Sequence, residues 1–249
     1  MSSNPQPKAI AVVGPTAVGK PAVAVALAQR LQTEIISADS RQIYCHMDIG
    51  TAKPTVEERG MVRHHLIDII DPDQTYSAGT YVRDVQKVLN ERQDMDQPPL
   101  IVGGAGLYVR ALAGGLFEGL QIPGQVLERI RKNFEGKKTS ELHDRLNTVD
   151  PTAAARIHLN DRQRIGRALE VYEATGTALT TWHRNASPNP SLLNLHIIGL
   201  QRDRAELYAR VDARVDSMMS LGLVNEVRML LDMGYTAETA ALKTFGYAE

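Results

Sequence analysis

AIAVVGPTAVGK, residues 9–20, decides the fold. Its first six residues are small or apolar, which is typical of a strand buried in a parallel sheet. Residues 14–20 match the first seven positions of the G-x-x-x-x-G-K pattern. The stretch PAVAVALAQRL at 21–31 then favours a helix, with Pro21 in the first turn, where proline is tolerated. A strand, a glycine-bearing loop and a helix in this order predict a loop that binds phosphate groups.

The loop has a specific chemistry for holding a diphosphate or triphosphate. Its glycines let main-chain N–H groups point inward, the helix N-terminus adds positive potential, and Lys20 adds a full charge. The predicted diphosphate- or nucleotide-binding residues are Gly14, Pro15, Thr16, Ala17, Val18, Gly19, Lys20 and Pro21. The last position is normally Ser or Thr, whose hydroxyl ligates Mg²⁺. Pro21 has no hydroxyl, so we expect phosphate binding to survive while the Mg²⁺ cofactor loses a protein ligand.

Strand and helix patterns alternate over the first part of the chain. Short apolar runs at 34–39, 65–70 and 99–104 favour three further strands. Ser77 is a suitable cap for a helix that runs to about Asp94. This alternation predicts an α/β fold of three layers, with helices on both faces of a parallel sheet.

The pattern changes at about Gly124, where strand signals stop and amphipathic helical stretches begin. Apolar residues at 195–200 predict one more core strand, followed by helices at about 204–221 and 223–233. We therefore expect a P-loop core formed by 1–123 and 195–249. An all-helical insertion is expected at 124–194.

Composition excludes several classes of protein. No apolar run approaches the roughly 18 residues of a membrane-spanning helix, and MSSNPQPK at the start lacks the apolar region of a secretory signal. The one cysteine, Cys45, excludes an internal disulfide framework. We expect a cytoplasmic protein without membrane contact. The net charge of −1 leaves a nucleic-acid partner open, because such a partner requires a basic face rather than a basic total.

Six linked blocks resemble the tRNA dimethylallyltransferase family in order and spacing. They are GPTAVGK at 14–20, ADSRQIY with MDIGTAKP at 38–54, HHLIDIIDP at 64–72, IVGGAGLYVRAL at 101–112, NDRQRIGRALEVYEATG at 160–176, and LYARVDARVDSM with GLVNEV and FGYAE at 207–249. The resemblance implies transfer of a dimethylallyl group from dimethylallyl diphosphate to the exocyclic amine of the adenosine beside the tRNA anticodon. That base must be flipped out, because a stacked base cannot enter a pocket. We expect a monomer that binds the anticodon stem-loop.

Asp39 ends a predicted strand at the mouth of the sheet, where parallel folds bind ligands. The resemblance makes it the general base; by itself, the carboxylate would equally suit a helix cap or a metal ligand. Ser40, Arg41 and Gln42 match a segment that contacts the adenosine, and the Gln42 amide would suit a base edge. The alternative for these three residues is an exposed turn.

Three further positions complete the catalytic set that the resemblance implies. Lys20 would neutralise the leaving diphosphate, which we expect to be the largest catalytic effect. Arg210 matches a diphosphate-binding arginine, and Arg214 shares its helix face four residues on. Ala105 occupies the position of the family's threonine at the reacting centre. The alternative for Arg210 is pairing with a nearby carboxylate.

The resemblance also defines a tRNA-contacting segment in the insertion, centred on Gln163, Arg164 and Arg167. Arginines can position phosphates or read guanine edges; the alternative is a salt-bridged helix face. The full predicted tRNA-binding set is Asp39, Ser40, Arg41, Gln42, Ala105, Leu127, Gln163, Arg164, Ile165, Gly166 and Arg167.

The sequence departs from the family pattern at four positions. Pro21 and Ala105 lack the hydroxyls usual there, Gly166 interrupts an apolar pair, and Ala248 replaces a basic residue. The sequence also stops at Glu249, before the family's basic C-terminal segment, so we expect either a shortened chain or a short natural variant. Because two site hydroxyls are missing, we expect weak or absent activity with an intact fold and intact donor binding.

Three alternatives remain open on the sequence. A P-loop small-molecule kinase, which binds ATP, would need the metal site that Pro21 lacks. A non-catalytic tRNA-binding relative would bind tRNA without prenylating it. An isopentenyltransferase that acts on free adenine nucleotides would lack an insertion as large as 124–194.

Overall fold

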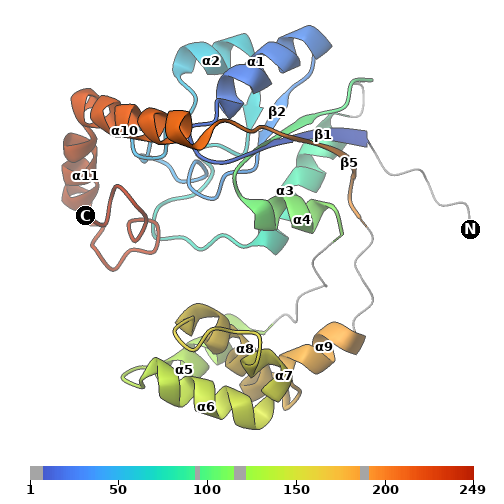
Figure 1. Cartoon of the computed structure of the whole chain (residues 1–249), viewed down its shortest axis with the longest axis vertical. Helices are drawn as coiled ribbons and strands as arrows, with labels where there is room; N and C mark the ends of the chain where they lie inside the picture. The colour runs from blue at the N-terminus through green and yellow to red at the C-terminus, as the bar shows by residue number, and fades with distance from the viewer. Residues whose placement is uncertain (1–7, 93–95, 115–121, 186–190) are drawn as a thin grey trace, which may run out of the picture. The chain divides into compact units, whose positions relative to one another are not determined.

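The computed structural model describes residues 8–92, 96–114, 122–185 and 191–249, which are coloured in Figure 1. The chain divides into two compact units. The first comprises Met1–Gly115 and Pro190–Glu249, and the second comprises Leu116–Asn189. The second unit contains most of the insertion predicted at 124–194.

A five-stranded parallel sheet forms the centre of the first unit. Its strands are β1 (Lys8–Val13), β2 (Ile35–Ser37), β3 (His64–His65), β4 (Leu100–Gly103) and β5 (Asn194–Gly199), in the order β3-β2-β4-β1-β5. Val13 of β1 lies opposite Gly103 of β4 and Gly199 of β5. Three strands therefore end at one edge, and the loops that follow them can meet there.

Helices cover both faces of this sheet. In Figure 1, α1 (Lys20–Leu31) and α2 (Val56–Met61) lie on one side, and α3 (Ala78–Glu91) and α4 (Gly106–Leu112) lie on the other. The helices α10 (Arg204–Leu221) and α11 (Leu223–Asp232) follow β5. The predicted α/β class, with a parallel sheet between helical layers, is confirmed.

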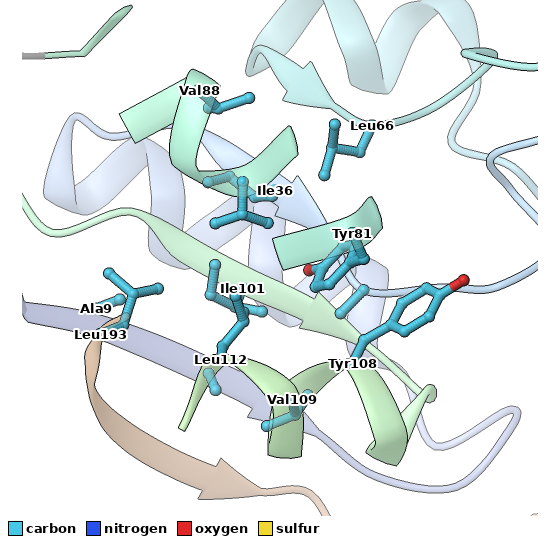
Figure 2. Packing of buried hydrophobic residues seen from close by; sticks show 13 residues of the cluster. Ala9, Ile36, Leu66, Tyr81, Val88, Ile101, Tyr108, Val109, Leu112 and Leu193 are labelled. Carbon is cyan, nitrogen blue, oxygen red and sulfur yellow. The ribbon is translucent and has the colours of Figure 1, made fainter. Parts of the chain in front are cut away.

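An apolar cluster fixes the sheet against α3 and α4. Ile36, Ile101 and Leu112 are fully enclosed in it. The rings of Tyr81 and Tyr108 stack beside them, with their centroids 4.3 Å apart (Figure 2). This packing holds β4 and α4 in place, and with them the loop that connects the two at the carboxyl edge of the sheet.

The strand predicted at 65–70 is wrong beyond His65. Leu66 and Asp68 take left-handed conformations with φ of 60° and 55°, which interrupt an extended chain. Only an isolated parallel bridge joins Ile70 to Tyr44. The apolar run HLIDII therefore packs as an irregular segment, although its composition resembles that of a strand.

Helix boundaries follow the local sequence more closely. The Ser77 hydroxyl accepts a hydrogen bond from Thr80 N–H at 3.0 Å and caps α3 as predicted. The limits of α10 and α11 agree with the predicted 204–221 and 223–233 to within one residue, and Gly222 separates them with a φ of 99°. None of the described helices is both long and apolar enough to cross a membrane.

The second unit is a helical bundle with a core of its own. Its helices are α5 (Gly124–Lys132), α6 (Thr139–Val149), α7 (Pro151–Ala154), α8 (Arg162–Thr175) and α9 (Leu179–Asn185). Leu142 and Leu146 of α6 pack against Ile165 and Leu169 of α8, and all four are fully enclosed. The absence of strands in this described region confirms its predicted helical character.

A buried carboxylate joins three helices of this unit. Asp150 accepts hydrogen bonds from Ala153 N–H at the start of α7 and from the N–H and hydroxyl of Thr180 in α9, at 3.0, 2.9 and 2.7 Å. Burial alone would raise the pKa of Asp150, but the bonds from Thr180 and Ala153 outweigh it and lower that pKa.

Candidate functional site

The loop between β1 and α1 has a backbone suited to binding an anion. Ala17 and Gly19 take left-handed conformations with φ of 64° and 108°. Gly19 is the N-cap of α1, and no side chain caps the first N–H groups of this helix. Pro21 has no N–H, so the N–H groups of Lys20 and Ala22 are the ones available to a phosphate at the start of α1, in the positive potential of the helix N-terminus.

Lys20 crosses this loop. Its Nζ donates to the main-chain oxygens of Gly14 and Pro15, both at 2.8 Å. Burial lowers the pKa of Lys20, the Asp39 carboxylate opposes this by raising it, and the Arg214 guanidinium lowers it further. The ammonium thus lies close to a carboxylate and to a second cation, as a site for an anionic ligand requires.

Three arginines from the segment after β5 converge on the same loop. Arg202 Nε donates to Val18 O at 3.4 Å, and Arg210 Nε donates to Ala17 O at 2.8 Å. Arg214 lies one turn beyond Arg210 on α10, close enough to Lys20 to affect its pKa. The predicted place of Arg210 beside the loop is therefore found, and two further arginines accompany it.

Asp39 faces this group of cations from β2. Its Oδ1 accepts the main-chain N–H groups of Arg41 and Gln42, at 2.8 and 3.4 Å, which fixes the carboxylate just after the strand. Burial lowers the pKa values of Lys20 and Arg214, and the charge of Asp39 opposes both shifts. The structure therefore brings the predicted base and the predicted phosphate loop together.

The residues around the loop do not fit a Mg²⁺ ion held by a motif hydroxyl. Pro21 lies exposed in the first turn of α1 and offers no ligand atom at the position where the motif needs one. Within the described ranges, no three His, Cys, Asp or Glu side chains gather where they could hold a metal ion. Asp39 is the carboxylate that acts on the charges of Lys20 and Arg214.

The Gln42 amide has a structural role that the sequence did not reveal. Its Nε2 donates to the main-chain oxygens of Ala52 and Thr51, at 3.1 and 3.4 Å, and its Oε1 accepts from the Ser37 hydroxyl at 3.4 Å. The amide thus ties β2 to the loop at 51–52, and its contact with a base edge stays a prediction. Ser40 is exposed in the turn before it.

The loop after β4 forms another wall of the site. Ala105 N–H donates to Ala38 O at 3.0 Å, and Ala105 starts α4 without contributing a hydrogen-bonding side chain. A Cβ at Gly104 would lie 3.9 Å from Lys20 Nζ, so this loop borders the phosphate loop. Burial, and then the charges of Tyr44 and Asp39, raise the pKa of Tyr108 to about 12 against the lowering effect of Arg41. Tyr108 is thus a neighbour of Asp39 that sequence reasoning missed.

A network behind Asp39 holds the segment that follows Gln42. The buried carboxylate of Glu226, on α11, accepts the N–H groups of Asp48, Ile49 and Gly50 at 2.9, 2.8 and 3.1 Å. It also accepts the Tyr247 hydroxyl at 2.6 Å. The C-terminal part of this unit therefore fixes the shape of the loop at 48–50.

The predicted tRNA-contacting segment lies on α8 of the helical unit, and its members differ in exposure. Gln163, Arg164 and Arg167 are exposed, Gly166 is half-buried, and Ile165 is fully enclosed in the core. Ile165 therefore has no side-chain surface for RNA, which corrects its place in the predicted set. Leu127, on α5, is half-buried.

Ion pairs occupy part of this segment. Arg164 pairs with Asp161 at 3.4 Å, and Arg167 with the buried Glu170 at 3.2 Å. Beside them a hollow of about 470 Å³ opens on the surface of the bundle. It is lined by Arg131, Phe134, Glu135, Leu142, Arg162, Gln163, Gly166, Arg167 and Glu170. Arginines dominate its charged lining, although Arg131 and Arg167 both pair with Glu170, and Phe134 is buried in the core of the bundle.

Comparison with protein families now adds to this geometry. The model of the IPP transferase family matches residues 42–249, which is most of the chain. The chain belongs to the IPP transferase family. Among similar family members, the tRNA dimethylallyltransferase of Syntrophobacter fumaroxidans is 45% identical over 96% of this chain and 70% of its own length. That of Thermotoga maritima is 45% identical over 96% of this chain and 78% of its own.

Solved structures of IPP transferases share the fold. The tRNA isopentenylpyrophosphate transferase of Bacillus halodurans has a TM-score of 0.65 and 39% identity, covering 96% of this chain and 75% of its own. The tRNA delta(2)-isopentenylpyrophosphate transferase of Staphylococcus epidermidis has a TM-score of 0.62 and 33% identity, covering 97% and 78%. The resemblance on which the sequence reasoning relied is therefore confirmed at the level of the family.

Proposed function

We propose that this IPP transferase moves the dimethylallyl group of dimethylallyl diphosphate to the exocyclic amine of the adenosine adjacent to the tRNA anticodon. The observation that carries the proposal is the position of Asp39 beside the phosphate loop: Ala38, the residue before it, accepts a hydrogen bond from Ala105 at 3.0 Å, and the neighbouring Gly104 borders Lys20 Nζ. The family membership and the names of its similar members support the same reaction.

The donor half of the site explains how the leaving group departs. The free N–H groups at the start of α1 and the Lys20 ammonium would bind the diphosphate. As the bond between the allylic carbon and the diphosphate oxygen breaks, negative charge grows on that oxygen. Fixed donors in the loop are oriented before the reaction and stabilise this charge, which is commonly the largest contribution to catalysis.

The acceptor half explains the fate of the proton. The adenosine amine forms the new bond to the allylic carbon, and the proton that it loses passes to Asp39. Backbone N–H groups hold Asp39 through Oδ1, and in the described structure Oδ2 makes no hydrogen bond. A free carboxylate oxygen at a fixed position is what a general base requires.

The helical unit supplies the proposed contact with the tRNA anticodon stem-loop. Gln163, Arg164 and Arg167 expose an amide and two guanidiniums beside the hollow of that unit. Their predicted partners are phosphates or base edges. Location in the cytoplasm and the monomeric state stay predictions.

Incubation with unmodified tRNA and labelled dimethylallyl diphosphate, followed by nucleoside analysis, tests this function. We expect label on the adenosine beside the anticodon, and none when that adenosine is replaced by guanosine. Asp39→Asn should lower the rate by about 10²- to 10⁴-fold while donor binding stays unchanged. Saturable tRNA binding without any labelled product, or phosphate transfer from ATP, would contradict the proposal.

We also propose that transfer is slow, because Ala105 and Pro21 lack hydroxyls. A single preorganised polar group that acts directly contributes about 10²- to 10³-fold in rate. Ala105→Thr combined with Pro21→Thr should therefore raise turnover in the same assay. Each single variant serves as the control for the other, and no gain in the double variant would remove this part of the proposal.

A further inference from the structure

We infer that this protein binds the donor diphosphate through a guanidinium cluster, Arg202, Arg210 and Arg214 with Lys20, and without a protein-held Mg²⁺ ion. The inference rests on the proposed function, because it concerns the donor of that reaction. Its consequence is that diphosphate binding does not need Mg²⁺.

The phosphate loop lacks the hydroxyl that would ligate a metal ion. In a phosphate loop of this pattern, a hydroxyl at the position of Pro21 reaches the metal ion that bridges the phosphate oxygens. Pro21 has the correct backbone for the first turn of α1, but it has no hydroxyl. The charge that the metal would neutralise must then be balanced by other cations, since a diphosphate carries several negative charges.

The pairing of β5 with β1 brings cationic residues to the phosphate loop. β5 pairs with β1 in parallel, so that Gly199 lies opposite Val13. Leu200 N–H donates to Val13 O at 2.8 Å and keeps the two chains together just beyond the strands. The residues that follow β5 are thereby brought alongside the phosphate loop, which follows β1.

The guanidiniums of Arg202 and Arg210 contact the phosphate loop. Arg202 and Arg210 already bond the loop carbonyl groups of Val18 and Ala17 through Nε. An ideal Cβ at Gly19 would lie 3.8 Å from one terminal nitrogen of Arg202, so that guanidinium lies against the loop, while its other terminal nitrogen pairs with Glu206. For Arg210, a bond through Nε leaves the two terminal nitrogens able to donate to a diphosphate.

Arg214 is the third arginine of the cluster, and its burial and its partners differ from those of the other two. This side chain is half-buried, and in the described structure it makes neither a hydrogen bond nor an ion pair. It follows Arg210 by one turn of α10, and Arg210 bonds the loop that Lys20 crosses. Its charge lowers the pKa of Lys20, and Asp39 opposes the lowering of both residues' pKa values. Two neighbouring cations in a partly desolvated site are unfavourable unless an anion joins them. A donor diphosphate between Lys20 and Arg214 would satisfy both.

Calorimetric titration of the intact protein with dimethylallyl diphosphate, and separately with inorganic pyrophosphate, tests the inference in the absence of tRNA. We expect dissociation constants in EDTA that equal those in Mg²⁺ to within about threefold, or that are tighter, because a metal ion would compete with the guanidiniums for the same oxygens. Dissociation constants more than about tenfold weaker in EDTA would overturn the inference.

Pro21→Thr is the decisive variant, since it returns the hydroxyl to the first turn. Its binding of pyrophosphate should become tighter with Mg²⁺, while Ala105→Thr should leave the metal dependence of binding unchanged. A Pro21→Thr protein that ignores Mg²⁺ would show that the hydroxyl is not the missing element, and would count against the inference.

Arg214→Gln tests the cluster. We expect pyrophosphate binding to weaken by about ten- to hundredfold in EDTA, as for loss of a charged hydrogen bond. Arg204→Gln is the matched control, because Arg204 lies on the same helix but bonds Tyr208 Oη at 2.9 Å and stacks over that ring. Equal effects of the two changes would mean that the net charge of α10, not the cluster, sets the affinity.

The outcomes separate this inference from the proposed function. Prenylated tRNA together with strictly Mg²⁺-dependent pyrophosphate binding would refute the inference and leave the function standing. Metal-independent pyrophosphate binding without any prenylated tRNA would support the cluster and refute the reaction. If pyrophosphate binds under neither condition, both fail.

Discussion

Gly103 lies where β4 passes the end of β2, and no larger residue fits there. A Cβ at this position would lie 2.0 Å from the main-chain oxygen of Ala38. Because Ala38 precedes Asp39, the missing side chain at position 103 helps to set the place of the Asp39 carboxylate. Gly166 is different, since a Cβ there meets no atom within 4 Å.

Substitutions of Gly103 and Gly166 by alanine should therefore have opposite effects on the free energy of unfolding. Gly103→Ala should lower the free energy of unfolding by about 1–3 kcal/mol, the usual range for overpacking, and should slow prenyl transfer through displacement of Asp39. Gly166→Ala should instead raise stability by roughly 0.5–1 kcal/mol, since alanine favours a helix interior. Denaturant unfolding monitored by circular dichroism measures both. A neutral Gly103→Ala would show that β2 and β4 can separate without loss.

At the scale of elements, Asp150 connects the end of α6 with α7 and α9. Its pKa lies below the ordinary value of 3.8 because hydrogen bonds from Thr180 and Ala153 outweigh burial. A carboxyl whose pKa is lower in the folded state stabilises the fold above the unfolded-state pKa. That contribution is lost as the pH falls through the folded-state pKa.

We therefore expect Asp150→Asn to destabilise the helical unit near neutral pH, by roughly 1–3 kcal/mol, since bonds to a charged acceptor are lost or weakened. The difference between wild type and variant should shrink as the pH falls from 3.8 through the lower folded-state pKa, because the carboxyl of the folded wild type becomes neutral only there. Thermal unfolding at a series of pH values measures this. A difference that does not change with pH would mean that shape, not charge, matters at Asp150.

Elements also show what sequence could and could not predict. The loop between β1 and α1, the Ser77 cap and the limits of α10 depend on neighbouring residues, and the structure confirms their predicted positions. The prediction of a strand at 65–70 was wrong because the pattern of apolar residues does not indicate the left-handed conformations of Leu66 and Asp68.

Those parts of the site that lie within a single sequence motif could be predicted from the sequence. Asp39 follows its strand within a local block, and its neighbourhood with Lys20 could be inferred from strand ends alone. The approach of Arg202 depends on the register between β1 and β5, which are far apart in sequence. The engagement of Gln42 with Ala52 likewise required coordinates. The family resemblance at Arg210 and its four-residue spacing from Arg214 were the sequence signals for the cluster.

At the scale of the whole molecule, each unit has its own apolar core. Leu146 lies in the core of the helical unit and Leu112 in that of the sheet, and both are fully enclosed. The same substitution in the two places therefore probes the two units separately.

Leu146→Ala should lower the stability of the helical unit by about 2–5 kcal/mol, the usual effect of such a cavity, and should leave pyrophosphate binding unchanged. Leu112→Ala should have a similar effect on the sheet unit and should weaken pyrophosphate binding at temperatures where that unit begins to unfold. Calorimetric unfolding, combined with titration at each temperature, measures both. Loss of pyrophosphate binding in Leu146→Ala at a temperature where the sheet remains folded would contradict this separation.

The tether formed by Glu226 sets an order in time. The loop at 48–50 is held by a carboxylate that lies 178 positions later than Asp48 in the chain, and by Tyr247 beyond it. Contacts between such distant residues form late, since the intervening chain must first be closed into a loop. On the ribosome, the loop at 48–50 therefore stays without its tether until α11 has been synthesised, and the bond from Tyr247 to Glu226 follows later still.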